Sequence, residues 1–491
     1  MSNAGDVAEY FRQNFHGARL ILVSNREPYI HLYTKSGEKI REPIGGLTKA
    51  LDPVMQAVGG TWVAWGSGNA DRKYSDENDR EPVPPFAPCY TLRRVWLERS
   101  VVRGYYYGFS NQVLWPLFHN MLEKVRLRRW YWTSYERVNR EFARTVGEEV
   151  NAGPSVVWFQ DYHLATCPRT IRQNNPDAIL TQFWHIPWVA PEVLQALPQA
   201  RDLLEGLLAN DLLAFHTPQF SNHFLEACDR MINCRVDFDK GEVLHEDRIC
   251  HVCSVPISID VEDMENYAAS ERSNRFIKRF IEKFKLQDKI VAVSVDRIDY
   301  TKGLLEKLDA LDLFFQNNPV WRGRLSLVMV SASSRDNIRA YSELKRALMR
   351  KIEQLNERYG DGDWEPVIFT GALDKWSLAP LYRLSNLAII SSLKDGMNLV
   401  AKEYIASQVE ENGVLLLSEF AGAAEDMGDS LPVNPYDTEG FADKILEAVR
   451  MTEAERKERM QRLRRRLREH NIYHWMMKVL RKLRAVTGPT T

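Results

Sequence analysis

Short runs of β-branched and aliphatic residues alternate along most of the chain with longer segments in which apolar residues recur at helical spacing. This alternation is typical of a parallel sheet covered by helices. In the first half it predicts strands at 20–24, 61–65, 156–160, 179–184 and 211–215, and helices that include 47–58, 134–150 and 218–231. In the second half it predicts strands at 290–295, 325–331, 366–370, 387–391 and 414–417, and helices near 304–316, 338–359, 399–410 and 438–451. The pattern therefore predicts an α/β protein with two doubly wound domains.

The two series of elements indicate where the domains meet. A strand ends near residues 256–260, before a polar and charged helical segment. We therefore expect an N-terminal domain over residues 1–258 and a C-terminal domain over 259–470. The terminal segment 471–491 is amphipathic and follows a break at His470-Asn471, so we expect a helix that packs back on the N-terminal domain. The basic run 456–468 contains interleaved apolar residues, which favours a solvated helix face over a binding tail.

Composition narrows the class of protein. The chain has 491 residues, and its 65 Lys and Arg nearly balance its 66 Asp and Glu, giving a formal net charge of -1. Such a charge provides no broad field to bind nucleic acid or an anionic membrane. No apolar run approaches the about 18 residues that a membrane span needs, no apolar leader begins the chain, and six cysteines are scattered. We expect a cytoplasmic protein with small-molecule partners, no nucleic-acid partner and no membrane partner.

Charged residues and glycines follow several predicted strands. In an open α/β sheet, ligands bind beyond the carboxyl ends of the strands, so these positions are the first candidates for a site. Arg26 follows the first strand, and after a predicted loop Gly45 and Gly46 open the next helix. A helix N-terminus with glycines can bind a phosphate through backbone N–H groups, and Arg26 can add a bidentate contact; a glycine pair before a helix is also often only a turn. The segment Gly66-Ser67-Gly68 lacks the third glycine of a dinucleotide site and lies in no clear strand–helix turn.

The second domain repeats this arrangement with two cations. Arg297 and Lys302 lie five residues apart in a loop that follows a predicted strand, and Arg335 follows the next strand. Fixed cations of this kind suit a diphosphate leaving group, because they stabilise the negative charge that develops as its bond to a sugar breaks. The alternative is a pair of surface cations balanced by Asp296 and Asp299.

The segment after the strand at 387–391 has the groups that would bind a polyhydroxyl ligand. It supplies carboxylates at Asp395 and Glu403, together with the backbone groups of Gly396, Met397, Asn398 and Leu399 at a helix N-terminus. Asp161 and His185 end strands of the first domain in the same way. The alternatives are ordinary ones, because a Glu in a first helical turn is often a dipole partner and a His after a strand is usually structural.

Two metal-like motifs have simpler explanations. The Cys250-His251-Val252-Cys253 segment lies in an alternating strand pattern with no second pair, and Asp361-Gly362-Asp363 lies in a turn-rich stretch. The sequence also lacks the common nucleophile-elbow and P-loop motifs. We therefore expect no metal site and no cofactor.

Taken together, the motifs resemble glycosyltransferase family 20, the retaining transferases that make trehalose 6-phosphate. The resemblance spans about Leu20 to Leu483 and rests on long strings of residues. These strings are Ser24-Asn25-Arg26, Tyr106 through Asn111 with Leu114-Trp115-Pro116, Asp161-Tyr162-His163-Leu164, His185-Ile186-Pro187, Arg297 through Leu304, Asp395 through Tyr404, and Glu419 through Ala423. The resemblance implies a fold of two Rossmann-like domains that face each other across a cleft (GT-B), with the C-terminal helix crossing back to the N-terminal domain.

The resemblance also implies roles for the candidate residues. The expected reaction moves glucose from a nucleoside-diphosphate glucose, with UDP-glucose the expected donor, to glucose 6-phosphate, without a protein nucleophile or a metal. The acceptor residues implied are Arg26, Tyr106, Trp115, Asp161 and Arg335. The donor residues implied are Gly45, Gly46, Arg297, Lys302, Asp395, Gly396, Met397, Asn398, Leu399 and Glu403. The residues implied to act at the reacting centre are His185, Arg297, Lys302 and Asp395.

Some features leave alternatives open. Glu27-Pro28-Tyr29 and the stretch to Pro43 also resemble glucosylglycerol-phosphate synthases, whose acceptor is glycerol 3-phosphate. A non-catalytic sugar-phosphate sensor is a second alternative. The sequence carries no aspartate-based phosphatase domain, so we expect a separate trehalose-6-phosphate phosphatase in the pathway; whether the chain forms a homo-oligomer is open.

Overall fold

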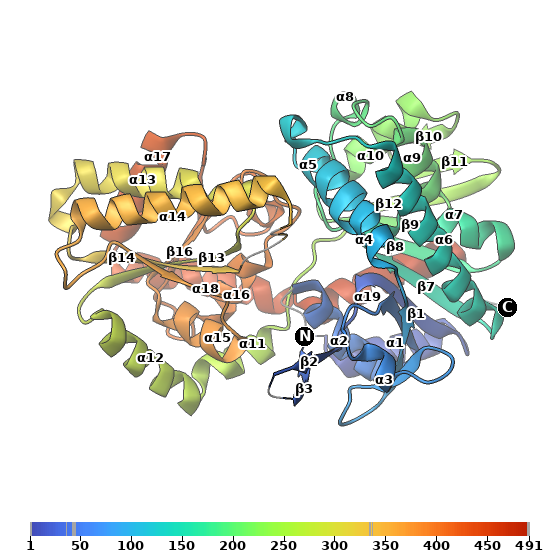
Figure 1. Ribbon diagram of the computed structural model, residues 1–491, viewed down its shortest axis with the longest axis horizontal. Helices are drawn as coiled ribbons and strands as arrows, with labels where there is room; N and C mark the ends of the chain where they lie inside the picture. The colour runs from blue at the N-terminus through green and yellow to red at the C-terminus, as the bar shows by residue number, and fades with distance from the viewer. Residues whose placement is uncertain (1, 36, 42–45, 333–334, 336, 489–491) are drawn as a thin grey trace. The chain divides into compact units, whose positions relative to one another are not determined.

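The computed structural model describes residues 2–35, 37–41, 46–332, 335 and 337–488. The chain divides into two compact units, which we call the first unit (Met1–Ile257 with Ile472–Thr491) and the second unit (Ser258–Asn471). The division falls one residue from the predicted boundary at 258, and the chain returns to the first unit at its last helix. Each unit is built around one sheet (Figure 1).

The first unit has a mixed ten-stranded sheet in the order β10-β11-β12-β9-β8-β7-β1-β4-β6-β5. Its seven central strands, from β12 to β6, are parallel to one another, and antiparallel strands close both edges. The strands are β1 (Arg19–Arg26), β4 (Thr61–Trp65), β5 (Arg80–Val83), β6 (Tyr90–Val95), β7 (Ser155–Gln160), β8 (Ile179–Phe183), β9 (Leu212–Phe215), β10 (Arg235–Asp237), β11 (Glu242–His245) and β12 (Arg248–Ser254). The central strands β1, β4, β7 and β9 are mostly apolar and buried, as expected where both faces of a sheet are covered.

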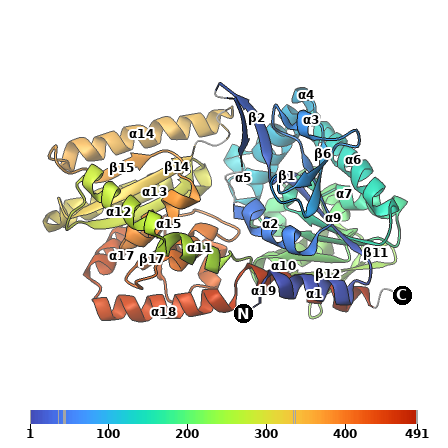
Figure 2. The same ribbon diagram turned by 90° about the horizontal axis from the view of Figure 1, so that it is seen from below.

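The helices of the first unit fill the connections between these strands. The α-helices are α1 (Ala4–Asn14), α2 (Gly46–Val58), α3 (Asp71–Tyr74), α4 (Arg99–Val102), α5 (Trp115–Phe118), α6 (Arg129–Asn151), α7 (Cys167–Asn174), α8 (Pro191–Leu194), α9 (Ala200–Leu208), α10 (Pro218–Met231) and α19 (Ile472–Thr487). The other helical turns are the π-helix η1 (Arg103–Leu114) and the 3-10 turns η2 (Leu122–Lys124) and η3 (Tyr162–Leu164). Helix α19 lies beside α1, as Figure 2 shows, and its Trp475 ring stacks on Trp158 of β7 at 5.4 Å. The last helix therefore belongs to the core of the first unit.

The second unit has a fully parallel six-stranded sheet in the order β15-β14-β13-β16-β17-β18. Its strands are β13 (Ile290–Arg297), β14 (Leu325–Ala332), β15 (Val367–Thr370), β16 (Leu387–Ile390), β17 (Val414–Ser418) and β18 (Leu431–Val433). Its α-helices are α11 (Val261–Ala269), α12 (Glu271–Phe284), α13 (Leu304–Asn317), α14 (Arg339–Tyr359), α15 (Lys375–Leu384), α16 (Leu399–Ser407), α17 (Thr438–Arg450) and α18 (Glu453–Glu469), with 3-10 turns η4 (Tyr300–Lys302), η5 (Pro319–Trp321) and η6 (Gly422–Glu425). Figure 1 shows α13, α14 and α17 on one face of the sheet and the other α-helices on the opposite face.

The predicted strands and helices are all present within a few residues of their predicted ends, and the predicted α/β class with two doubly wound sheets is confirmed. Two local predictions were wrong. The stretch after β1 was expected to be a loop, but β2 (Ile30–Thr34) and β3 (Gly37–Arg41) form an antiparallel pair. The Gly66–Gly68 segment does join a strand to a helix, from β4 to α3, and its glycines are there for packing: a Cβ on Gly66 would lie 2.4 Å from the Trp96 ring.

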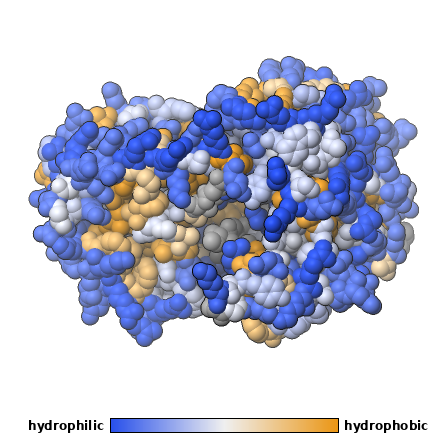
Figure 3. Space-filling model, viewed as in Figure 1, coloured by the Kyte–Doolittle hydropathy of each residue, from blue (hydrophilic) through white to orange (hydrophobic). Residues whose placement is uncertain are grey.

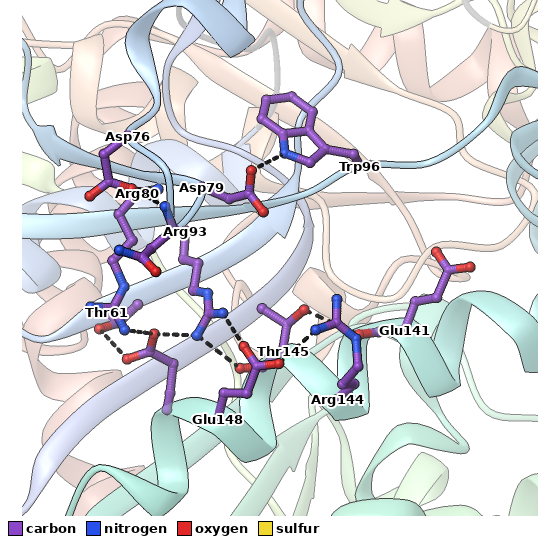
Figure 4. A network of polar contacts seen from close by, with 12 residues as sticks. Thr61, Asp76, Asp79, Arg80, Arg93, Trp96, Glu141, Arg144, Thr145 and Glu148 are labelled. Carbon is purple, nitrogen blue, oxygen red and sulfur yellow. Dashed lines mark hydrogen bonds and ion pairs between the residues drawn. The ribbon is translucent and has the colours of Figure 1, made fainter.

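A polar network fastens α6 to strands β4, β5 and β6. Glu149 accepts hydrogen bonds from Arg80 at 2.6 Å, Arg93 at 2.7 Å and Thr61 at 3.3 Å. Figure 4 shows the two arginines meeting side chains from α6, among them Glu148. Burial alone would raise the pKa of Glu149, but the Arg93 and Arg80 contacts hold it below its ordinary value. This ion network ties the C-terminal end of α6 to one side of the sheet.

The surface gives little further indication of partners. The face shown in Figure 3 is mostly hydrophilic, with hydrophobic residues in limited areas. No helix in the described part of the chain is long and apolar enough to span a membrane. Helix α18, which contains the basic run, buries Met460, Leu463 and Leu467, and its Arg464 binds Glu265 at 2.6 Å and the carbonyl oxygens of α16. Most of its remaining cations pair with nearby carboxylates, as expected for a solvated face.

Candidate functional site

Each sheet reverses its strand order at one point. In the parallel part of the first sheet, the order runs β6-β4-β1 on one side and β7-β8-β9 on the other, so the reversal lies between β1 and β7. In the second sheet it lies between β13 and β16. A doubly wound sheet opens a crevice outside the carboxyl ends of the two strands at such a point, and ligands bind there. The loops after β1, β7, β13 and β16 carry most of the candidate residues predicted from the sequence.

Arg26 is the last residue of β1 and is turned outward by a bulge. The register between β1 and β4 shifts between Ser24 and Arg26, and the Ser24 hydroxyl donates to the Arg26 carbonyl oxygen at 2.6 Å. Arg26 is exposed, and its Nη2 donates to the Tyr106 hydroxyl at 2.7 Å, with the guanidinium 4.9 Å from the Tyr106 ring. The bulge thus presents a cation with a fixed aromatic partner at the edge of the sheet.

Tyr106 is positioned by the π-helix η1. The side-chain amides of Asn111 and Gln112 donate to the carbonyl oxygens of Tyr106 and Tyr107, five residues earlier, at 2.7 and 2.9 Å. Two glycines on η1 allow close packing against α6, because a Cβ on Gly104 would lie 2.2 Å from the Ser134 hydroxyl and one on Gly108 would lie 2.5 Å from the Tyr131 ring. Wide helical turns of this kind often occur at functional sites.

Asp161 and Trp115 complete this edge of the first unit. Asp161 follows β7 with φ +68°, a conformation that few non-glycine residues adopt. Its carboxylate accepts from the backbone N–H of His185 at 3.2 Å. Trp115 opens α5 and lies 6.1 Å from the Tyr162 ring, whose hydroxyl donates to Asn111 at 3.1 Å. The structure therefore brings together four of the predicted residues in this unit, namely Arg26 with Tyr106 and Asp161 with His185, and links Trp115 to them through Tyr162.

His185 rests on an aromatic floor. Its ring lies 4.5 Å from the ring of Phe183, 5.3 Å from that of His216 and 6.3 Å from that of Trp475 on α19. Its Nε2 is 2.8 Å from the side-chain oxygen of Gln160. Burial and the neighbouring His216 lower the pKa of His185 well below its ordinary value, so the ring is neutral near pH 7. A neutral imidazole bonded in this way can orient a hydroxyl group but contributes no positive charge to the binding of a phosphate.

In the second unit, Arg297 and Arg335 share one buried carboxylate. Asp299 is fully buried, and its Oδ2 is 3.2 Å from Arg335 and 3.9 Å from Arg297. Burial alone would raise the pKa of Asp299, but the two arginines hold it below its ordinary value. The Arg335 side chain is only 5% exposed, whereas that of Arg297 is 40% exposed. Asp299, considered in the sequence only as a charge balance, is thus the residue that holds both guanidinium groups together.

Lys302 and Asp395 form an ion pair at the second reversal point. The Lys302 Nζ lies 2.5 Å from Asp395 Oδ2, and the two side chains are 12% and 15% exposed. Their loops are joined by the backbone: the Ser391 hydroxyl donates to the carbonyl oxygens of Lys302 and Gly303 at 3.0 and 2.8 Å. Gly303 has φ +60°, and a Cβ there would lie 1.9 Å from the Ser391 carbonyl oxygen, so only glycine fits.

The segment from Gly396 to Glu403 is held tightly at the start of α16. Asn398 has φ +93° and caps the helix, its side chain accepting from the Ala401 N–H at 3.0 Å and donating to Asp395 at 3.0 Å. Met397 is buried, and its carbonyl oxygen accepts from the Ala423 N–H at 2.8 Å. This bond fixes the backbone between Gly396 and Leu399. Glu403 accepts from the Tyr382 hydroxyl at 3.1 Å.

The remaining predicted residues and motifs are placed as follows. Gly45 lies outside the described residues, and Gly46 begins α2. The Cys250–Cys253 segment lies in β12, and Asp363 of the DxD motif pairs with Lys285 in a loop. Among the residues that the structure describes, no three His, Cys, Asp or Glu side chains are grouped as metal ligands.

Sequence reasoning gave Glu27 no role in the site. It lies between Arg26 and a proline directly after a buried strand, and it is 1% exposed. No local pattern marked it for burial, because the groups that hold its carboxylate, Ser67 and Arg94, lie far along the chain.

Comparisons with known proteins identify the family. The model of glycosyltransferase family 20 matches residues 18–485. An alpha,alpha-trehalose-phosphate synthase (UDP-forming) A of Dictyostelium discoideum is 34% identical over 476 residues, covering 96% of this chain; the chain spans 63% of that relative's length. The alpha,alpha-trehalose-phosphate synthase of Burkholderia xenovorans, solved in complex with glucose-6-phosphate, has a TM-score of 0.84 at 29% identity, covering 95% of this chain and 100% of the other. The E. coli protein solved with UDP-2-fluoro glucose bound has a TM-score of 0.84 at 30% identity, covering 95% and 99%. The match over nearly the whole length shows that the chain belongs to glycosyltransferase family 20.

Proposed function

We propose that the protein transfers glucose from UDP-glucose to glucose 6-phosphate, with retention at the anomeric carbon, and forms α,α-trehalose 6-phosphate and UDP. The observation that carries the proposal is the Lys302–Asp395 pair at the strand reversal of the second unit, which sets a cation beside a hydroxyl acceptor. A sugar nucleotide needs both groups at its glycosidic bond. The ligands printed for the Burkholderia and E. coli structures are a sugar phosphate and a UDP-sugar analogue, which supports this choice of substrates.

The donor is assigned to the second unit. Arg297 and Lys302 bind the diphosphate and stabilise its charge as the bond to glucose breaks. Glu403, fixed by Tyr382, accepts from the ribose hydroxyls, and Asp395 with the backbone from Gly396 to Leu399 binds the glucose hydroxyls. We also assign Gly45 and Gly46 to the diphosphate.

The acceptor is assigned to Arg26, Tyr106, Trp115, Asp161 and Arg335, with Arg335 as a further phosphate ligand. Arg26, with Tyr106 and Trp115, binds the phosphate of glucose 6-phosphate, and Asp161 binds its sugar hydroxyls. His185, neutral and bonded to Gln160, orients a hydroxyl of the transferred glucose.

The reaction proceeds on one face of the transferred glucose. The glycosidic oxygen leaves with the diphosphate, the acceptor hydroxyl attacks from the same side, and its proton passes to the leaving phosphate. No side chain acts as nucleophile in this scheme. Arg297 and Lys302 supply the positive charge at the leaving group, so we expect activity to persist in the presence of a chelator of divalent cations.

The test is a release assay with purified protein, UDP-glucose and glucose 6-phosphate. Release of UDP together with a phosphorylated disaccharide supports the proposal, and its absence with UDP-, ADP- and GDP-glucose alike would refute it. Glycerol 3-phosphate belongs in the same panel, because the Glu27-Pro28-Tyr29 segment resembles enzymes that use it. Turnover only with that acceptor would assign the protein to the sister activity, and binding without turnover would make it a sensor.

A further inference from the structure

A buried group of charged residues lies behind Arg26. Adjacent residues at the end of β1 point to opposite sides, so Arg26 is exposed while Glu27 is 1% exposed. We call Glu27, His31, Asp71, Glu81 and Arg94 the carboxylate hub. All five residues are buried, and they come from the end of β1, from β2, α3, β5 and β6. The hub therefore joins the segment after Arg26 to four other elements of the first unit.

Glu27 is the member of the hub nearest to Arg26 in the chain, and three donors fix it. Its Oε1 accepts from the backbone N–H of Ser67 at 2.7 Å and from the Ser67 hydroxyl at 2.9 Å, and its Oε2 accepts from Arg94 Nε at 2.8 Å. Arg94 also donates to the carbonyl oxygen of Tyr29 at 3.2 Å. The backbone on the C-terminal side of Arg26 is thus held at two points, Glu27 and Tyr29, by the strands beside it.

The other members of the hub hold Arg94 and β2. Arg94 Nη1 is 2.6 Å from Glu81, and Arg94 Nη2 is 3.7 Å from Asp71. His31 Nε2 is 2.8 Å from Glu81, and the His31 backbone N–H donates to Asp71 at 2.7 Å. Three carboxyl groups therefore face one guanidinium and one imidazole away from water. Even with His31 charged, the hub is neutral only if one carboxyl group carries a proton.

We propose that Glu27 is a positioning residue of the acceptor site, which fixes the backbone of Arg26 and so sets the affinity for the acceptor phosphate. This inference rests on the proposed function, because the acceptor is the ligand assigned to Arg26. Glu27 does not touch the substrate; it acts through the peptide that it shares with Arg26. The Ser67 hydroxyl can donate to the carboxylate or accept from the protonated acid, so the anchor persists in both forms.

The pH dependence of acceptor affinity provides a measurement that a purely structural role for Glu27 would leave unchanged. Burial and the neighbouring Asp71 raise the pKa of Glu27 to about 8, against the opposing effect of Arg94. Loss of this proton adds a negative charge directly behind Arg26, within a region of low dielectric. The affinity for an anionic acceptor is therefore expected to fall as the pH rises through about 8.

The experiment compares Glu27→Gln and Glu27→Ala with the wild-type protein between pH 6.5 and about 9.5, a range chosen to bracket the pKa. Glutamine keeps the shape of the protonated acid, so we expect a near-normal acceptor KM at pH 7 and no rise in acceptor KM at alkaline pH. Alanine removes the three accepted hydrogen bonds, and we expect acceptor KM to rise roughly tenfold or more while kcat and donor KM change little. Glu205→Gln, which alters an arginine-paired carboxylate on α9, is the matched control.

Two results would overturn the inference. One is a Gln variant that keeps the wild-type rise in acceptor KM at alkaline pH; the other is an Ala variant, folded by circular dichroism, whose acceptor KM is unchanged. If the Ala variant does not fold, the pH profile of the Gln variant decides. Direct calorimetric titration with glucose 6-phosphate and with glycerol 3-phosphate separates this inference from the proposed function. If the wild-type protein turns over and the Glu27 variants keep its acceptor KM and pH profile, only the inference is refuted. If the wild-type protein does not turn over, the proposed function is refuted, and the binding titration decides on the role of Glu27.

Discussion

Replacement of Lys302 by alanine tests the second unit most directly. Lys302 is the cation of a nearly buried ion pair at the strand reversal, with its Nζ 2.5 Å from Asp395. Removing it takes away the charge assigned to the leaving diphosphate and leaves the Asp395 carboxylate without its ammonium partner beside an anionic substrate. Both effects raise the barrier of the transfer step.

The size of the effect follows from the geometry. Two unit charges about 4 Å apart interact by about 4 kcal/mol at an effective dielectric constant of about 20. Loss of one donor aimed at developing charge typically lowers kcat by about 10²- to 10³-fold. We therefore expect Lys302→Ala to lower kcat by about 10²-fold or more, with a smaller change in donor KM.

The assay is initial-rate UDP release at saturating UDP-glucose and glucose 6-phosphate. Lys351→Ala is the matched control, because Lys351 pairs with Asp309 at 2.7 Å on helices of the same unit away from the strand reversal. Adding Asp395→Asn to Lys302→Ala should cost less than the sum of the single changes, since it removes the carboxylate that has lost its ammonium partner. A folded Lys302→Ala protein with near-normal kcat would refute the role given to Lys302.

Three further changes test other parts of the structure. Arg335→Ala removes the proposed charge-assisted phosphate contact, about 2–3 kcal/mol, and should raise acceptor KM with little change in kcat; an unaltered acceptor dependence would exclude Arg335 from the site. Gly303→Ala forces a Cβ to 1.9 Å from the Ser391 carbonyl oxygen and should lower the free energy of unfolding in urea by about 2 kcal/mol or more, whereas Gly371→Ala, which meets nothing within 4 Å, should not. Glu27→Gln should flatten the pH dependence of stability. The pKa of Glu27 is raised to about 8, so the folded protein keeps a proton that the unfolded chain has lost above about pH 5. The free energy of unfolding of the wild-type protein should therefore fall between about pH 5 and 8, by up to roughly 5 kcal/mol. An equal fall in the Glu27→Gln variant would contradict the burial argument.

The sequence predicts the place of the site better than its contacts. The order of strands and helices implies that residues such as Lys302 and Asp395 meet at a carboxyl edge, because right-handed crossovers leave few topologies for such a chain. Their ion pair depends on the close approach of Gly303 to Ser391, a tertiary contact that no local pattern encodes. Family resemblance supplied the candidate role of Tyr106, but nothing in its neighbourhood predicted a π-helix. That helix is held by side-chain amides and by glycine contacts with α6.

Glu27 shows the same limit for a single residue. A glutamate between an arginine and a proline after a strand is typical of a surface loop. Its burial is set by Arg94, 67 residues later in the chain, and by a hairpin that was expected to be a loop. Local sequence patterns therefore indicate which residues end the strands, and tertiary packing decides which of them face away from water.

The return of the last helix to the first unit affects how the chain can fold during synthesis. Trp475 of α19 packs on Trp158 and lies 6.3 Å from the ring of His185, so the aromatic floor beneath that histidine is incomplete until the last helix is present. A ribosome makes the whole second unit, Ser258–Asn471, before it releases α19. The half of the protein that begins folding first is thus the half that finishes last, and a nascent chain stalled after residue 471 would leave Trp158 and Phe183 without the Trp475 ring that packs on them.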